Sequence, residues 1–555
     1  MLVNQMKKWK LLPPPPEGVL KDCHLPPLLT HLLFNRGVTT PSEVEPFLAA
    51  DERLQGDPQL LPDIAKAVAR ILRAVLNREL IAIYGDFDAD GVTATTVLTE
   101  GLSQLGGRVF AYIPHRQEGH GLSCSALEEV RLQGASLVIT VDCGTGDHRE
   151  VEEARAKGLD LIITDHHRPT SHLPPALAVV NPQREDSSYP TRELAGVGVA
   201  FKLLQALYEA TGRRSPDELL DLVALGTVAD LVPLTRENRY LVRKGLEVLN
   251  ESHRPGIQEL KSQAGVKRVD TQAISHTLAP RLNAAGRVDH ASEAYALLVA
   301  TSTSEASELA ARLERTNAER RSLTEKVLEM AERKLGLPVE APILIVGDEN
   351  FPAGVNGLVA SKLVEKFYRP AVVLELGEET SQGSCRSIPE FDVLAALSEC
   401  RELLTRFGGH AQAAGFILPT SNVEQLHKRL TQIALRRLGG LDLQPSIPID
   451  AEIPLSSLNG EVFRLLERLE PFGPGNPVPT FLSRGVTVMD CQRVGENGEH
   501  LKLKLREGEI SWEAIGFDLG SLSEQVTSSV DIVYNLGVDD WGGERLLRLE
   551  ILDFR

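Results

Sequence analysis

The chain has 555 residues, of which 42% are apolar and 25% charged, and 59 basic against 77 acidic side chains give it a formal charge of −18. This composition excludes a disordered chain and a generally basic DNA-coating protein, and the length allows about three to four domains. No apolar run approaches the roughly 18 residues of a membrane helix. The six cysteines form no C-x-x-C pair, which fits a reduced, cytoplasmic protein without disulfides or a cysteine zinc site.

The first sixty residues are rich in proline and predict only a short helical lead-in. Short apolar runs then alternate with helical stretches. The runs predict five buried parallel strands: Leu80–Tyr84, Val109–Ile113, Leu137–Val141, Leu159–Ile163 and Ala178–Val180. Helices are expected over Val92–Leu105, Ser123–Leu132 and Arg149–Lys157. This order predicts an open doubly wound α/β domain with its ligands at the carboxyl ends of the strands.

Residues 196–300 are expected to be mostly helical, and Thr303–Leu335, which lacks Gly and Pro, predicts one long helix that acts as an interdomain spacer. A second, smaller α/β domain should follow, with strands Ile343–Val346 and Ala371–Leu376 and helices Leu358–Phe367 and Val393–Leu404. Candidate strands Leu501–Arg506, Trp512–Phe517 and Arg545–Leu552 predict a small C-terminal β-barrel. The expected divisions are a lead-in over 1–60, the first α/β domain over 61–300, the connecting helix over 301–336, the second domain over 337–442 and the barrel over 443–555.

Acidic and histidine residues gather where three of the predicted strands end. The three groups are Asp86, Asp88 and Asp90, then Asp142, and then Asp165, His166 and His167. The carboxyl ends of parallel strands meet at one edge of a sheet, so these residues should lie close together. So many carboxylates would repel each other unless cations neutralised them. Carboxylate oxygens with imidazole nitrogen suit Mn²⁺ or Mg²⁺, and two such ions are the arrangement used to hydrolyse phosphate esters.

Each of these residues also has a simpler interpretation. A single Asp after a strand is usually a helix N-cap, and a His pair in a loop is usually solvated. Their joint occurrence at three strand ends favours a metal-dependent hydrolase. Asp230 lies in an apolar segment where an unpaired carboxylate would be costly, and either a metal or an arginine could neutralise it.

Four motifs, in this order, resemble the DHH phosphoesterase superfamily: GDFDADG (85–91), VDCG (141–144), TDHH (164–167) and GTVAD (226–230). Three further motifs resemble its RecJ branch: PRLNAAGR (280–287), GSCRS (383–387) and RFGGHAQAAGF (406–416). The resemblance runs from about residue 50 to the C-terminus. It implies a DHH domain, a DHHA1-like second domain and an OB-like barrel. It also implies a 5′→3′ exonuclease that degrades single-stranded DNA to 5′-mononucleotides in DNA repair and recombination. Single-strand-binding protein and a helicase are the partners it suggests, and the default expectation is a monomer.

The resemblance also implies roles for individual residues. Asp88 and Asp142 would hold one ion, and Asp90, Asp142, His166 and Asp230 the other, with Asp86 as a supporting acid and Asp165 orienting His166. His167 would lie against the scissile phosphate. Arg287 would contact phosphate too, because a guanidinium matches its oxygens. Arg116, Ser384 and Arg386 would hold the 5′-terminal phosphate. The remaining residues expected to contact substrate are Arg281, Asn283, Arg406, Gly408, Gly409 and His410.

Simpler alternatives remain for several of the residues expected to bind DNA and for the barrel strand. Arg116 and Arg386 could be ordinary surface arginines, and Gly408 with Gly409 could merely end a helix. The alternating run Leu501–Arg506 could track a DNA backbone with its cations, or could be a half-buried strand with solvated lysines.

The chain departs from the family pattern in two loops, and residues 142–146 also vary after the Gly while they retain the ligand Asp142. Gly119-His120-Gly121 stands where an aromatic residue is expected, and residues 350–357 lack an expected Trp-His pair. Two rival functions follow: a DHH phosphodiesterase for short oligonucleotides or cyclic dinucleotides, or a DNA-binding scaffold without activity. The barrel and the GSCRS segment weigh against the first, and the complete set of expected ligands weighs against the second.

Overall fold

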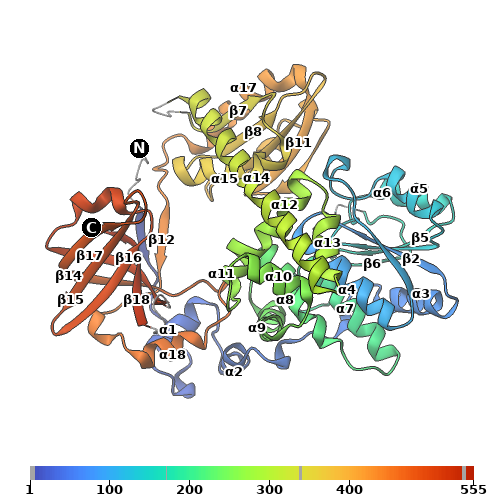
Figure 1. The fold of residues 1–555 in the computed structure, drawn as a ribbon. Coiled ribbons are helices and arrows are strands. Elements are labelled where there is room, and N and C mark those ends of the chain that lie inside the picture. The colour runs from blue at the N-terminus through green and yellow to red at the C-terminus, as the bar shows by residue number, and fades with distance from the viewer. Residues whose placement is uncertain (1–6, 170–171, 337–340, 540–545) are drawn as a thin grey trace.

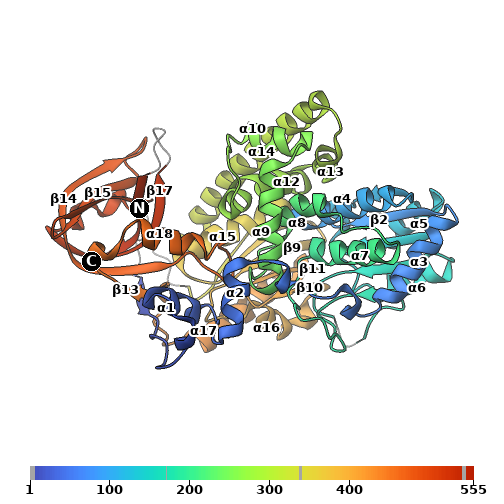
Figure 2. The same cartoon turned by 90° about the horizontal axis from the view of Figure 1, so that it is seen from below.

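The computed structural model describes residues 7–169, 172–336, 341–539 and 546–555. Its two α/β units and its barrel each have their own sheet (Figure 1). Both Figure 1 and Figure 2 place the barrel at the opposite end of the molecule from the first sheet, with helices between them. No helix among the described residues combines the length and the apolar character that a bilayer span requires.

The first sheet is the expected doubly wound one. Its five strands pair in parallel in the order β3-β2-β4-β5-β6, and each lies within one residue of its predicted ends. They are β2 (Leu80–Gly85), β3 (Arg108–Tyr112), β4 (Leu137–Val141), β5 (Asp160–Thr164) and β6 (Ala178–Val180). Since β2, β4 and β5 are neighbours, the residues that follow them meet at one edge.

Helices cover both faces of this sheet. One face packs against α3 (Ile64–Leu76), α4 (Ala89–Gln104) and α7 (Gly196–Ala210), and the other against α5 (Cys124–Leu132) and α6 (His148–Ala156). The prediction placed the start of α4 three residues too late, at Val92. The Asp88 side chain accepts hydrogen bonds from the backbone N–H groups of Asp90 and Gly91 and so starts the helix earlier.

The rest of the first unit is helical, as expected. It consists of α8 (Leu220–Ala229), α9 (Arg236–Glu251), α10 (Pro255–Gln263), α11 (Thr271–Ala273), α12 (Ala279–Val288) and α13 (Ser292–Val299). A π-helical turn, Ile274–Leu278, leads into α12, where Pro280 lacks the N–H that an α-helical turn would use. The long helix α14 spans Thr303–Leu335, the predicted range, with Ser302 as its N-cap.

The second α/β unit differs more from the prediction. Its sheet has the order β10-β11-β9-β8-β7, and among these pairs only β7 (Leu344–Asp348) and β8 (Ala371–Glu375) are parallel. The strands β9 (Thr380–Arg386), β10 (Arg406–His410) and β11 (Ala413–Pro419) were not predicted. Gly408 and Gly409 lie inside β10, so the interpretation that they end a helix is wrong.

Its helices are α15 (Ala353–Phe367), α16 (Val393–Ser398) and α17 (Val423–Leu438). The helix α15 begins five residues before the predicted Leu358, so most of the divergent segment 350–357 is its first turn. The helix α16 ends six residues before the predicted Leu404, and a 3₁₀ turn, Arg401–Leu403, leads to β10.

The C-terminal strands close into a barrel, because β14 pairs with both β15 and β17 at the two ends of the series β14-β15-β16-β18-β17. The strands are β14 (Thr480–Val494), β15 (His500–Glu507), β16 (Ile510–Gly516), β17 (Ser529–Asp539) and β18 (Leu546–Phe554). Arg545 of the predicted strand Arg545–Leu552 lies outside the described residues. The segment before the barrel forms β12 (Ser446–Ile449), β13 (Ala451–Glu452) and α18 (Gly460–Glu467).

The N-terminal lead-in is part of the barrel unit. β1 (Lys8–Leu11) pairs in parallel with β12, and α1 (Pro27–Asn35) and α2 (Pro41–Ala49) share a core with the barrel strands. The guanidinium of Arg239 on α9 ties this unit to the first α/β unit, because it donates to the carbonyls of Phe47, Leu469 and Glu470 at 2.7–2.8 Å. Burial lowers the pKa of Arg239 to about 9.

Candidate metal centre and the facing arginines

The carboxyl edge of the first sheet gathers the predicted metal ligands into three overlapping groups. They are Asp86 with Asp88 and Asp142, Asp90 with His166 and Asp230, and Asp142 with His166 and His167. Within each group the potential ligand atoms all lie within 4.8 Å of one another. The structure therefore brings all six predicted metal-binding residues together, with Asp142 and His166 each in two groups. We call this cluster the metal centre.

Backbone contacts hold the acids on α4 in place. Asp88 is both the N-cap of α4 and a member of the metal centre, so its two interpretations are compatible. Asp90 accepts hydrogen bonds from the N–H groups of Gly196 at 2.6 Å and Val197 at 2.9 Å, which begin α7. These contacts fix the Asp90 carboxylate at the start of two helices, where partial positive charge stabilises an anion.

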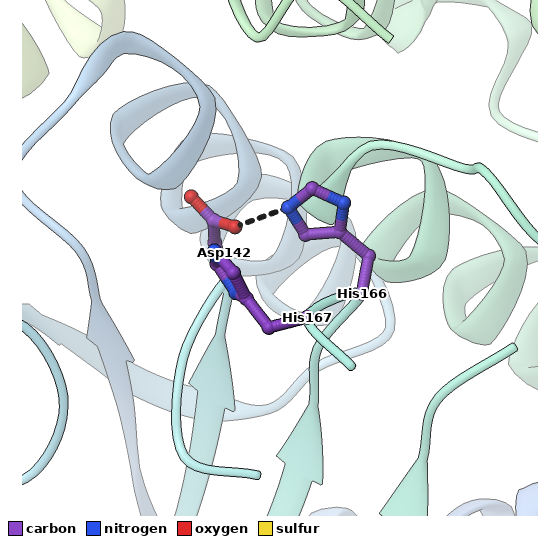
Figure 3. A group of neighbouring side chains, drawn as sticks. All are labelled: Asp142, His166 and His167. Atoms are coloured by element: carbon purple, nitrogen blue, oxygen red, sulfur yellow. Dashed lines mark ion pairs between the residues drawn. The ribbon is translucent and has the colours of Figure 1, made fainter. Parts of the chain in front are cut away.

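Asp142 occupies a strained position at the end of β4. Its φ of +62° lies in the left-handed region that side chains rarely adopt, and strain of this kind is common at functional sites. Gly196 makes room for it, because a Cβ there would lie 2.6 Å from the Asp142 Cβ. The Asp142 Oδ1 lies 3.0 Å from the His166 Nε2 (Figure 3), but neither atom has a hydrogen-bond partner among the described residues.

Asp230 follows α8 as its C-cap and reaches the same cluster. Its Oδ2 lies 3.6 Å from the His166 Nε2, so the neighbour found here is a histidine of the metal centre. The close packing of α8 on α4 depends on Gly226, where a Cβ would lie 2.2 Å from the Thr93 Oγ1 and 2.9 Å from the Asp90 Oδ1.

The electrostatics of the metal centre are those of a cation site. Burial, followed by the charge of Asp230, raises the pKa of Asp90 to about 7, and burial raises that of Asp230 to about 6. Burial and the charges of Asp90 and Asp88 raise the pKa of Asp142 well above its usual range. Three buried atoms of the centre have no hydrogen-bond partner in the part of the chain that the structure describes: the Asp86 Oδ1, the Asp142 Oδ1 and the His166 Nε2. These residues fit divalent ions, because bound cations would satisfy the open donor atoms and neutralise the carboxylates.

The structure changes the expected role of Asp165. We expected it to orient the ring of His166, but its Oδ1 accepts a hydrogen bond from the His167 Nδ1 at 2.8 Å and meets His166 only through the backbone N–H. Burial alone would lower the pKa of His167, but the Asp165 carboxylate raises it to about 9. Hydrogen bonds from His167 and from the backbone outweigh the effect of burial and keep the pKa of Asp165 low. Asp165 therefore orients His167.

A contact that the sequence did not predict lies beside the centre. The His120 Nδ1 lies 2.9 Å from the Asp86 Oδ2, and its ring centroid lies 4.3 Å from that of Phe87. The Arg116 guanidinium lies over the same Phe87 ring at 4.8 Å. The sequence showed His120 only as a departure from the family pattern in its loop. That departure did not indicate a contact between His120 and an acid of the metal centre.

Three arginines come together next to this cluster: Arg116 after β3, Arg287 on α12 and Arg386 at the end of β9. We call them the arginine group. Burial and the charges of Arg116, Arg320 and Arg386 lower the pKa of Arg287 to about 9. Burial also lowers the pKa values of Arg116 and Arg386, although Asp86 and Asp88 partly offset this for Arg116. Partly buried guanidinium groups in this arrangement suit an anion.

Two glycines at the start of α15 let this helix approach the arginine group. A Cβ on Gly354 would lie 2.1 Å from the Arg287 carbonyl oxygen, and one on Gly357 would lie 3.1 Å from the Arg386 Nη2. The Arg287 Nη1 donates to the Gly354 carbonyl at 3.2 Å. Ser384 precedes Arg386 by two residues on β9 and so lies on the same face of the strand. The divergent segment 350–357 thus packs against two of the three arginines.

Two other predicted substrate residues have structural partners. Arg281 donates from its Nε to Glu314 at 2.5 Å and from its Nη1 to the Thr277 carbonyl at 2.6 Å. The Asn283 Oδ1 accepts a hydrogen bond from the backbone N–H of Ala89 at 2.8 Å, at the start of α4. Both residues therefore support the elements around the centre.

The β10–β11 hairpin of the second unit faces the metal centre. The Arg406 Nη2 donates to the His120 carbonyl at 3.0 Å. Burial, followed by the charges of His167, His166 and Arg168, lowers the pKa of His410. A Cβ on Gly408 would meet open space, and Gly409 has a φ of +132°. Arg406 and His410 thus bring the hairpin next to the residues of the metal centre, and Gly408 leaves its backbone open there.

The alternating strand of the barrel has a more ordinary environment. The leucines of Leu501–Arg506 are buried and its cations are exposed. Asp490 and Glu513 pair in register with Lys504, and the Glu513 carboxylate lies 3.5 Å from the Lys502 Nζ. The acids on the neighbouring strands partly neutralise this basic face.

Comparisons with known proteins agree with this architecture. Three family models match: the DHH family N-terminal domain over residues 80–227, the DHHA1 domain over residues 340–435 and the RecJ OB domain over residues 449–553. The single-stranded-DNA-specific exonuclease RecJ of Bacillus subtilis is 39% identical over 567 residues, which cover 100% of this chain and 71% of that protein. The protein of the same name from Thermus thermophilus is 34% identical over 568 residues, which cover 99% and 78%.

Solved structures extend the similarity to three dimensions. The crystal structure of Thermus thermophilus RecJ in complex with Mn²⁺ matches with a TM-score of 0.86 at 32% identity, over 99% of this chain and 79% of that one. A crystal structure of exonuclease RecJ bound to manganese matches with a TM-score of 0.60 at 35% identity, over 69% of this chain and 98% of that one. The expected DHH, DHHA1-like and OB-like folds are confirmed.

Proposed function

Because this chain belongs to the RecJ family of single-stranded-DNA-specific exonucleases, we propose that it is a metal-dependent 5′→3′ exonuclease that degrades single-stranded DNA to 5′-mononucleotides. One observation supports this function above all others. A cluster of acids suited to divalent cations lies beside an arginine group suited to phosphate, close enough for Asp86 and Asp88 to act on the pKa of Arg116. A phosphodiester satisfies both clusters at once.

Two Mn²⁺ or Mg²⁺ ions would bind at the metal centre. Asp88 and Asp142, with Asp86 beside them, would hold one ion, and Asp90, Asp142, His166 and Asp230 the other. When bound, the ions supply charge stabilisation at the phosphate oxygens and an activated water for in-line attack. The carboxylates are already fixed by the helix starts of α4 and α7, so little reorganisation is needed on binding.

The remaining residues would bind and orient the strand. Asp165 fixes the His167 ring through Nδ1, which leaves Nε2 for the scissile phosphate. Arg287 would bind the same phosphate with its guanidinium fork. Arg116, Ser384 and Arg386 would bind the 5′-terminal phosphate and so set the polarity. Arg406, Gly408, Gly409 and His410 would meet the following backbone, while Arg281 and Asn283 would act through the elements they support.

The wider biological setting follows from the same family membership. The enzyme would work in DNA repair and recombination in the cytoplasm, as a monomer, on strands supplied by a helicase and coated by single-strand-binding protein. The domain divisions at residues 60, 300, 336 and 442 belong to this proposal too, with the connecting helix joining the catalytic and DHHA1-like domains.

Digestion of one single strand carrying a 5′ label or a 3′ label tests the proposal. With Mn²⁺, we expect stepwise loss from the 5′ end, abolished by chelator and by Asp142→Ala. Digestion that starts at the 3′ end would overturn the polarity. A preference for dinucleotides or cyclic dinucleotides over long strands would favour the rival phosphodiesterase, and binding without any shortening would favour an inactive scaffold.

A further inference from the structure

The long helix α14 carries an arginine, Arg320, that forms no ion pair with any of the described residues. Three other arginines of this helix have carboxylate partners: Arg312 with Glu293, Arg321 with Glu314, and Arg333 with Glu329. Arg320 has no carboxylate within 4.0 Å in the described part of the chain, and its buried Nε has no hydrogen-bond partner there. A buried donor left open costs free energy, so such a group calls for a ligand.

A second open polar atom lies on the same face of α14. Asn317 precedes Arg320 by three residues, which makes the two side chains neighbours on the helix surface. The Asn317 side chain is only 2% exposed, and its Oδ1 has no hydrogen-bond partner among the described residues. The Asn317 acceptor and the Arg320 donor are thus both unsatisfied, although they lie one helical turn apart. If the two side chains served only to stabilise the fold, we would expect these atoms to be paired.

The position of Arg320 extends the arginine group along one direction. Its charge lowers the pKa of Arg287, and burial together with Arg321 and Arg281 lowers its own. Since Arg287 lies on α12, which packs against α14, Arg320 adds positive charge to the Arg287 side of the arginine group.

We propose that Arg320 binds a second backbone phosphate of the single strand, next to the phosphate that Arg287 contacts. The connecting helix is then part of the substrate-binding surface as well as an interdomain spacer. This inference rests on the proposed function, because it takes the ligand to be the strand that the enzyme digests. The open Nε of Arg320 and the open Oδ1 of Asn317 leave a donor and an acceptor free for this phosphate and its hydration.

Steady-state digestion of a long 5′-phosphorylated strand with Mn²⁺ tests the role of Arg320. In Arg320→Gln we expect KM to rise about tenfold, the loss of one charge-assisted contact, with kcat within about twofold of wild type. The slope of log KM against log salt should become shallower by about 0.7, which corresponds to one phosphate contact fewer on a single strand. Arg320→Lys should keep the slope and lose part of the affinity, because it keeps the charge but not the fork.

A matched control and a stability measurement separate binding from structure. Arg333→Gln removes the same charge from an exposed site on the same helix and should change neither KM nor its salt slope. The melting temperature of Arg320→Gln should equal or exceed that of wild type, because an unbalanced buried charge is lost. A lower melting temperature, or a KM and slope equal to those of wild type, would overturn the inference. If wild type itself does not shorten single strands, it is the proposed function that fails.

Discussion

The metal centre and the arginine group are neighbours of opposite charge, and they differ in how many domains contribute their residues. The acids follow strands and helices of one domain, and backbone N–H groups fix Asp88 and Asp90 whether or not a second domain is present. The arginines come from both α/β units, and Arg287 and Arg386 both pack against the first turn of α15. The comparison indicates that the metal site is preformed within one domain, whereas the phosphate site exists only when the two domains are correctly docked.

Removing an acid from the metal centre should have the largest effect. Asp142 takes part in two of the three ligand groups, so Asp142→Asn should lower kcat/KM by at least about 10³-fold. The same change should raise the melting temperature of the metal-free protein, because it removes a like charge from a buried cluster. Asp160→Asn is the matched control at the opposite edge of the sheet, where the acid accepts a hydrogen bond from Arg70. Full activity in Asp142→Asn would refute the assignment.

Removing an arginine should have a smaller and more selective effect. Arg386→Gln should reduce kcat/KM by about 10- to 100-fold on a 5′-phosphorylated strand, the usual range for a hydrogen bond to a charged group. It should have little effect on a 5′-hydroxyl strand, because that substrate lacks the terminal phosphate. Arg108→Gln, at the far end of β3, should leave both rates unchanged. Equal losses on the two substrates would show that Arg386 does not recognise the 5′ end.

The pH dependence of stability should also distinguish the two regions. The folded pKa values of Asp90 and Asp230 are raised to about 7 and about 6, so their contribution to stability is fully present below the ordinary carboxyl pKa and is lost as pH rises through these values. The metal-free protein should therefore melt at a lower temperature at pH 8 than at pH 5.5, and Mn²⁺ should remove most of this difference. In Asp90→Asn the metal-free dependence should be weaker. Calorimetry that shows the metal-free protein gaining stability over this range would contradict the prediction.

The cations of the barrel should matter least. Lys504 lies between Asp490 and Glu513 in register, so its charge is partly balanced before any DNA arrives. We expect Lys504→Gln to change the affinity for a long single strand by less than about twofold, as is usual for exposed pairs. Fluorescence anisotropy with a labelled strand measures this directly. A loss as large as that of Arg386→Gln would mean that the barrel strand is a principal contact.

The sequence predicted the elements whose residue pattern results directly from their burial. The continuous apolar runs of β2, β4 and β5 reflect burial on both faces, so their ends, and the meeting of Asp88, Asp142 and His166, could be predicted. The absence of Gly and Pro likewise located both ends of α14.

The failures have physical causes as well. The strands β9 and β10 contain glycines and polar residues and lack a clear apolar pattern, although Gly383 and Gly409 are needed for close packing there. Two alanines and a glycine precede the short apolar run of β11. The start of α15 was hidden by Gly354 and Gly357, which serve contacts with another element. The pairing of Asp165 with His167, and that of Asp86 with His120, depends on ring orientation, which spacing along the chain does not specify.

The most direct test of the central claim is a crystal structure with Mn²⁺, using anomalous diffraction to locate the ions. Two anomalous peaks should lie at the carboxyl edge of the first sheet, one beside Asp88 and the other beside Asp90, His166 and Asp230, with Asp142 bound to both. A single peak, or ions that do not touch Asp142, would contradict a two-ion centre shared through this residue.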